Sequence, residues 1–131
     1  MEIIFTDREA DVMQVLWDHG ACLVADVQAH LADQLAYTTV LTVLRTLETK
    51  KYVGHEAAGR GHRYHALIAP QQARKSALRH LTDKLFKGSA DLLMTHLVTD
   101  QLSDAQADRL RALLAEHRED GKKDGKKGGP K

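Results

Sequence analysis

Residues Leu35 to Leu67 read LAYTTVLTVLRTLETKKYVGHEAAGRGHRYHAL, an amphipathic helix that runs directly into a hairpin. The helix is predicted to begin at Tyr37 or Thr38 and to end near Lys51. At about 100° per residue, its apolar and polar side chains separate onto two faces. The apolar face carries Val40, Val43, Leu44 and Leu47, and the opposite face carries Thr38, Thr39, Thr42, Arg45, Thr46 and Thr49. One face therefore packs on a core, and the other is short, polar and rich in methyl groups.

The hairpin that follows is predicted as two strands joined by a glycine turn. The first strand contains Tyr52, Val53 and His55, and the second runs from His62 to Leu67. Gly59 and Gly61 flank Arg60 and supply the backbone angles of a tight turn.

The polar side of the helix has the chemistry of a surface that reads DNA. A threonine hydroxyl can bond phosphates or base edges, its methyl can touch the thymine methyl, and arginine suits guanine or phosphate. A solvated helix face is the alternative, but such a face more often carries Glu, Lys and Gln, because threonine is a mediocre helix former. The predicted DNA-binding residues are Thr38, Thr39, Thr42, Arg45, Thr46, Arg60, His62 and Arg63.

Two further helices are predicted before the threonine-rich one. Thr6 and Glu9 form a capping-box pattern ahead of apolar residues at helical spacing, and Gly20 ends this first helix. A short apolar bridge, residues 21–24, leads to a second helix from about Ala25 to Leu35. Three helices and a hairpin predict a winged helix-turn-helix.

From Pro70 onward the pattern is helical alone, with segments at 71–87, 90–99 and from Ser103 to about residue 117. So short a run of helices cannot bury its leucines unaided. Either the first half of the chain or a second copy must cover them, and the second copy is favoured because two-fold symmetry presents two reading helices to two half-sites. The predicted dimerisation residues are Leu78, Leu81, Leu85, Leu92, Leu93, Leu97, Leu110, Leu113 and Leu114.

The predicted fold class is mainly α with a small β-hairpin, a winged helix-turn-helix followed by a helical dimerisation region. The predicted boundaries are 1–69 for the DNA-binding domain, 70–117 for the dimerisation region and 118–131 for a basic tail. The tail is rich in glycine and charge, which predicts disorder.

The net charge and the placement of the charges point in opposite directions on DNA binding. The chain has a formal net charge of +1. Residues 1–70 hold nine acidic side chains (Glu2, Asp7, Glu9, Asp11, Asp18, Asp26, Asp33, Glu48, Glu56) against six basic ones (Arg8, Arg45, Lys50, Lys51, Arg60, Arg63). Five of these six lie between residues 45 and 63, where phosphate attraction would act. A dimeric protein-interaction module that keeps the winged fold without binding DNA is the alternative function.

Other function classes find no support in the sequence. The single cysteine, Cys22, cannot form an internal disulfide, and no segment has the layout of a membrane span or a signal peptide, so a cytoplasmic protein without a membrane partner is expected. The eight histidines show no ligand spacing, which predicts surface or DNA-facing roles and no metal site or other cofactor. No phosphate loop, nucleophile elbow or hydrolase motif is present, so no enzyme is predicted.

Several motifs together resemble the penicillinase repressor family of bacterial winged-helix transcriptional repressors. They are TDREADVMQVLW, AYTTVLTVLRTLETKKYV, GRGHRYHAL, LFKGSADLL and DQLSDAQADRLRALL, and the similarity runs from about Phe5 to His117. The resemblance implies a homodimer that represses by binding a palindromic double-stranded operator. It also implies that the reading helix uses Thr38, Thr39, Thr42 and Arg45, and the wing Arg60, His62 and Arg63.

The sequence departs from the family pattern at three places. Leu23 stands where relatives often carry Ser or Thr as the cap of the second helix. Relatives that respond to beta-lactams are cut by a regulatory protease at an Asn-Phe bond, where this chain has Thr95-His96. Copper-responsive relatives use paired cysteines near the C-terminus, and this chain has none after Cys22. Copper sensing of that type is excluded, and proteolytic and uncut release remain two alternatives.

Overall fold

The computed structural model describes residues 2–127, with side chains through residue 120. The chain divides into two compact units, Met1–Leu81 and Thr82–Lys131. Among the described residues the architecture is mainly helical with one small antiparallel sheet, as predicted. Each unit is described separately below.

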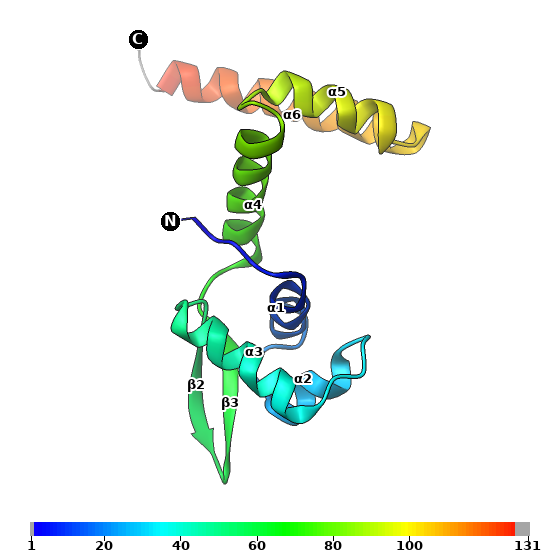
Figure 1. Ribbon diagram of the computed structural model, residues 1–131. Helices are drawn as coiled ribbons and strands as arrows, with labels where there is room; N and C mark the ends of the chain where they lie inside the picture. The colour runs from blue at the N-terminus through cyan, green and yellow to red at the C-terminus, as the bar shows by residue number, and fades with distance from the viewer. Residues whose placement is uncertain (1, 128–131) are drawn as a thin grey trace. The chain divides into compact units, whose positions relative to one another are not determined.

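The first unit is a three-helix core with a wing (Figure 1). Its helices are α1 (Asp7–His19), α2 (Val24–His30) and α3 (Tyr37–Thr49). The predicted capping box opens α1, because the Thr6 hydroxyl accepts from the Glu9 N–H and the Glu9 carboxylate accepts from the Thr6 N–H. Gly20, with φ of 78°, ends α1 where a side chain would be strained.

The second helix is shorter than predicted. It ends at His30 instead of near Leu35, because Leu31 adopts an extended backbone with ψ of 139°. The amide of Gln28 donates to the carbonyl of Leu35 at 2.9 Å and closes the turn into α3. Ending the helix here lets Leu31 and Leu35 both pack against the core, which helical periodicity alone could not reveal.

The hairpin is present as predicted, and the sheet gains one strand that the sequence analysis missed. Strands β2 (Val53–Ala58) and β3 (Gly61–Ala66) pair antiparallel around a turn at Gly59, whose φ is 62°. The extra strand, β1 (Cys22–Leu23), lies on the other edge of β3, in the segment predicted as a bridge. A two-residue strand is too short to produce an alternating pattern.

The core joins all three helices to the sheet. Val12, Met13, Val27, Val40, Leu44 and Leu47 are fully covered, and Tyr64 of β3 is 2% exposed. The Trp17 indole N–H donates to the carbonyl of Ile68 at 2.9 Å and ties α1 to the segment that follows the hairpin.

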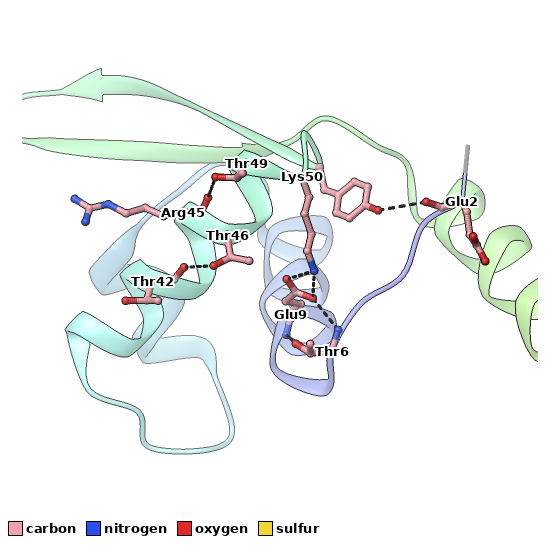
Figure 2. Close-up of polar contacts among 9 residues, drawn as sticks. Glu2, Thr6, Glu9, Thr42, Arg45, Thr46, Thr49 and Lys50 are labelled. Carbon is pink, nitrogen blue, oxygen red and sulfur yellow. Dashed lines mark hydrogen bonds and ion pairs between the residues drawn. The ribbon is translucent and has the colours of Figure 1, made fainter.

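One charged residue, Glu9, is buried in this core at 3% exposure. Its carboxylate accepts from Lys50 Nζ at 2.9 Å and 2.8 Å through its two oxygens, and from the Thr6 N–H at 2.8 Å (Figure 2). Burial alone would raise the pKa of Glu9, but the hydrogen bonds from Lys50 and Thr6 and the charge of Lys50 lower it below its ordinary value of 4.5. The pair therefore joins the start of α1 to the end of α3.

The lowered pKa of Glu9 gives the fold a defined acid sensitivity. A carboxyl that is more acidic when folded stabilises the protein fully above pH 4.5, and this contribution is lost as the pH falls through the folded pKa. Urea unfolding between pH 7 and pH 3 measures it, with Glu9→Gln as the variant that cannot ionise. We expect the wild-type midpoint to fall more steeply below pH 4.5 than that of the variant, and parallel curves would contradict this assignment.

The first residues of the chain pack against the start of α4 (Pro70–Leu85). The Ile3 N–H donates to the Ser76 hydroxyl at 2.6 Å, the Tyr52 hydroxyl donates to the Glu2 carbonyl at 3.4 Å, and the Glu2 carboxylate lies 2.7 Å from His80 Nδ1. Ala73 of α4 is also buried. The first compact unit thus continues to Leu81, while the functional boundary at residues 69 and 70 stays a prediction.

The second unit contains the end of α4, then α5 (Ala90–Asp100) and α6 (Asp104–Lys127). Ser89 caps α5, and Ser103 and Gln106 form a reciprocal cap at the start of α6. The prediction of disorder from residue 118 onward was wrong for the described part of the tail, because α6 continues to Lys127. Residues 128–131 of the tail lie outside the described residues. Extending an existing helix needs no new nucleus and no apolar burial, so an argument from composition underestimates how far the helix continues.

Candidate nucleic-acid interface

Helix α3 divides into two faces as the sequence predicts. Its apolar residues Val40, Leu44 and Leu47 are fully buried against α1 and α2. On the outer face, four of the predicted DNA-binding residues are exposed: Thr38, Thr42, Arg45 and Thr46. A fifth, Thr39, is half-buried. The helix therefore presents a polar surface to solvent along its whole length.

Three threonine hydroxyls on this surface bond the helix backbone. Thr42 Oγ1 donates to the Thr38 carbonyl at 2.9 Å. Figure 2 shows the other two bonds, from Thr46 Oγ1 to the Thr42 carbonyl at 2.9 Å and from Thr49 Oγ1 to the Arg45 carbonyl at 3.0 Å. Thr49 was left out of the predicted site although it is exposed on the same face. Its spacing of seven residues from Thr42 is the signal that could have included it.

The two lysines at the end of α3 have different roles. Lys50 turns toward α1 and is held by Glu9, so its charge is neutralised within the protein (Figure 2). Lys51 is exposed, with a φ of 70°. The exposed cations on the helix and hairpin are Arg45, Lys51, Arg60 and Arg63, and Arg45 is also hydrogen-bonded to Tyr64.

The predicted wing residues do not share one face. Arg60 lies in the exposed hairpin turn, while His62 and Arg63 are neighbours on β3 and must point to opposite faces of the sheet. His62 lies on the Tyr64 side, where its ring centroid is 4.5 Å from that of His55. Arg63 is paired in register with Glu56 of β2, so an acidic residue stands beside it.

A cluster of titratable groups joins α3 to the hairpin behind the polar surface. The Glu48 carboxylate contacts His55 Nδ1, and the His55 ring also packs against Tyr64. Burial, and then the charge of Glu48, raise the pKa of Tyr64. In the part of the chain that the structure describes, no three His, Cys, Asp or Glu side chains are arranged to hold a metal ion. The cluster thus positions the wing against the helix.

Cys22 is a buried free cysteine. Its thiol lies 3.3 Å from the Gly20 carbonyl, to which it donates. Burial, and then the charge of Asp26, raise the pKa of this thiol. A thiol held in its protonated form is a poor nucleophile, so a structural role explains this residue.

The predicted dimerisation leucines remain largely uncovered. Leu93 and Leu110 are half-buried, and the other seven are at least 36% exposed: Leu78, Leu81, Leu85, Leu92, Leu97, Leu113 and Leu114. No residue of α5 is buried. Single exposed leucines are ordinary, but a series of them on consecutive helices is typical of a surface that a partner covers.

None of the helices within residues 2–127 combines the length and the apolar character that a bilayer span requires.

Comparison with solved structures finds chains that are similar to this one at low sequence identity and with TM-scores below 0.5. One is a MarR family protein from Bacillus stearothermophilus, 14% identical, with a TM-score of 0.49, covering 92% of this chain and 77% of that one. Another is BpsR from Bordetella bronchiseptica, whose DNA binding is regulated by 6-hydroxynicotinic acid. It is 19% identical, with a TM-score of 0.46, covering 86% of this chain and 75% of that one.

Comparison at the level of sequence is more specific. The penicillinase repressor of Bacillus licheniformis is 25% identical over 116 residues, which cover 86% of this chain and 91% of the relative. The family model described as penicillinase repressor matches residues 5–116. The match includes α3, the hairpin and most of the helical second half.

Proposed function

Because the chain belongs to the penicillinase repressor family, we propose that it represses transcription by binding a palindromic operator as a homodimer. The family is one of winged-helix transcriptional regulators and not of enzymes. The observation that carries the proposal is the exposed face of α3, which holds threonines and Arg45 over a fully buried apolar face. A helix of this kind fits the major groove, where it can reach base edges.

The hairpin supplies the second contact. Arg60 in its turn and Arg63 on β3 are exposed cations of the hairpin that follows the reading helix, and we assign them to phosphates that flank the half-site. Phosphate contacts fix the register of the protein on DNA without reading sequence. His62 faces the opposite side of β3 from Arg63 and lies beside His55, so it does not share this phosphate contact.

Dimerisation supplies the affinity that one reading head lacks. A half-site contact by a single small domain is weak, and two linked heads gain effective concentration. The uncovered leucines of α4, α5 and α6 support an interface between two copies, because each would otherwise expose apolar area to water.

The acidic first half supports the alternative, a module that binds protein instead of DNA, and one titration separates the two. The full chain is mixed with fluorescein-labelled duplexes, one of random sequence and one from upstream of its own gene, and anisotropy is followed as salt increases. A repressor shows a logarithmic loss of affinity with salt, at about 0.9 per phosphate contact. The absence of binding to either duplex at low salt would reject the proposed function.

Arg60→Ala tests the phosphate role of the wing. Because a phosphate contact carries no sequence information, we expect the variant to lose affinity by the same factor on operator and unrelated duplex, and the salt slope to decrease by about 1. Arg8→Ala removes an exposed arginine of α1 outside the proposed interface and serves as the control. A loss confined to the operator would instead assign Arg60 to a base.

Release from DNA has two routes. A regulatory protease would have to cut within α5, where the Thr95 hydroxyl donates to the Asp91 carbonyl at 2.9 Å and His96 lies 3.4 Å from Asp100. A protease binds an extended backbone, so this helix must first unwind. Mass spectrometry of the protein from cells exposed to a beta-lactam separates the two routes: a chain cut between residues 90 and 100 supports proteolysis, and an intact chain that has left its operator supports uncut release.

A further inference from the structure

We propose that Thr42 and Thr46 read the operator as hydrogen-bond acceptors, so that each selects a base with an exposed amino group, adenine or cytosine. This inference rests on the proposed function and specifies the chemistry of its target. Both side chains are exposed on the reading face of α3, and both use their hydroxyl proton within the protein; Figure 2 shows this bond for Thr46.

The restriction to accepting follows from the number of hydrogen bonds that a hydroxyl group can donate and accept. A threonine hydroxyl has one proton to donate and two lone pairs to accept. Thr42 gives its proton to the Thr38 carbonyl at 2.9 Å, and Thr46 gives its own to the Thr42 carbonyl at 2.9 Å. What each residue then offers to a ligand is an oxygen lone pair and a methyl group.

The major groove presents complementary partners for only two bases. Adenine exposes its N6 amino group and cytosine its N4 amino group, whereas guanine and thymine expose only acceptors and, for thymine, a methyl group. An acceptor opposite another acceptor gains nothing and loses a bond to water. The threonine methyl can at the same time touch the methyl of a thymine on a neighbouring step.

Thr38 and Thr39 provide an internal contrast. Among the described residues none accepts a hydrogen bond from either hydroxyl, because the carbonyls four residues earlier lie before the helix begins at Tyr37. These two threonines keep a proton that can be donated to a phosphate or to guanine. One residue type therefore has two different capacities along a single helix.

Turning the Thr42 hydroxyl toward a base acceptor would break its bond to the backbone. A hydrogen bond of this kind corresponds to about two- to tenfold in an equilibrium constant. That factor is the selectivity we expect at each of the two positions.

The experiment first finds the operator and then alters single atoms in it. The full chain selects from a pool of duplexes with a randomised central segment, and Thr42→Val, which keeps the shape but removes the oxygen, selects from the same pool. The position whose preference changes is the one that faces Thr42. We expect adenine or cytosine there for the wild type, and no preference between amino and non-amino bases for the variant.

Base analogues then separate accepting from donating. If adenine is selected, purine in its place lacks the N6 amino group, and 7-deazaadenine lacks the N7 acceptor; if cytosine is selected, 2-pyrimidinone lacks the N4 amino group. Loss of the amino group should weaken wild-type binding by about three- to tenfold and Thr42→Val binding by less than about twofold. Thr42→Ser, which keeps the hydroxyl, should behave as wild type.

Three outcomes overturn the inference while leaving repression intact: guanine or thymine at the facing position, sensitivity to 7-deazaadenine in place of purine, or a Thr42→Val selection identical to that of the wild type. Failure to select any sequence would instead reject the proposed function. Thr39→Val is the matched control. The Thr39 hydroxyl keeps its proton, so the affinity lost in this variant should not depend on the amino group of the base.

Discussion

Leu113→Asp is expected to convert the dimer to a monomer and to weaken operator binding by about 100-fold to 10,000-fold, the range that linked binding sites gain from effective concentration. Leu113 is 52% exposed within its own chain, so aspartate there is tolerated by the isolated subunit. In a dimer the same position would place a carboxylate in an apolar interface, where an unpaired charge is costly. Light scattering measures the mass, and anisotropy with the operator measures the affinity.

Ala112→Asp makes the same change of charge on the opposite side of α6. At 100° per residue, Ala112 lies far from the face shared by Leu110, Leu113 and Leu114. This control should remain dimeric and bind the operator normally. A wild-type chain that is already monomeric at micromolar concentration, or a Leu113→Asp variant that stays dimeric, would show that α6 is not in the interface.

Lys50→Met is expected to lower the free energy of unfolding of the first unit by about 2 to 3 kcal/mol, because it leaves the Glu9 carboxylate buried without its counterion. The value is below that of a fully buried pair, since the Lys50 side chain is 39% exposed. For a unit of this size, we expect the melting temperature to fall by about 10 °C or more. Urea and thermal unfolding at pH 7 measure both quantities.

Lys51→Met is the matched control, because the neighbouring lysine is exposed and no carboxylate holds it. It should change stability by less than about 0.5 kcal/mol. Adding Glu9→Gln to Lys50→Met should recover part of the loss, because a neutral amide needs no counterion. Equal effects of the two lysine substitutions would show that the bond to Glu9 contributes nothing to stability.

The sequence predicted the features that local patterns control. The two faces of α3, the glycine turn of the hairpin and the capping box at Thr6 each depend on residues a few positions apart, and all three are confirmed. The family was also identified correctly, because its motifs cover the reading helix, the hairpin and the second half together.

Features that depend on distant residues were missed. Glu9 was assigned to the capping box alone, and its second partner, Lys50, is 41 residues away. The early end of α2 and the strand at Cys22 both depend on packing against other elements, and neither leaves a periodic signal. In the candidate site, exposure of the threonines could be predicted, and the alternation of a strand already separates His62 from Arg63, but the pairing of Arg63 with Glu56 required the register of the sheet.

The hydrogen bond between Ile3 and Ser76 spans 73 residues and has a consequence for folding during synthesis. A ribosome makes Ile3 near the start, and the hydroxyl that pairs with it is added only after the reading helix and the wing have been synthesised. A nascent chain that stops at residue 69 would hold every residue proposed to touch DNA, yet Ile3 would lack Ser76 and the covering side chain of Ala73. The first compact unit is therefore completed by the first turns of α4, so the winged-helix part of the chain can finish folding only after Ser76 has been synthesised.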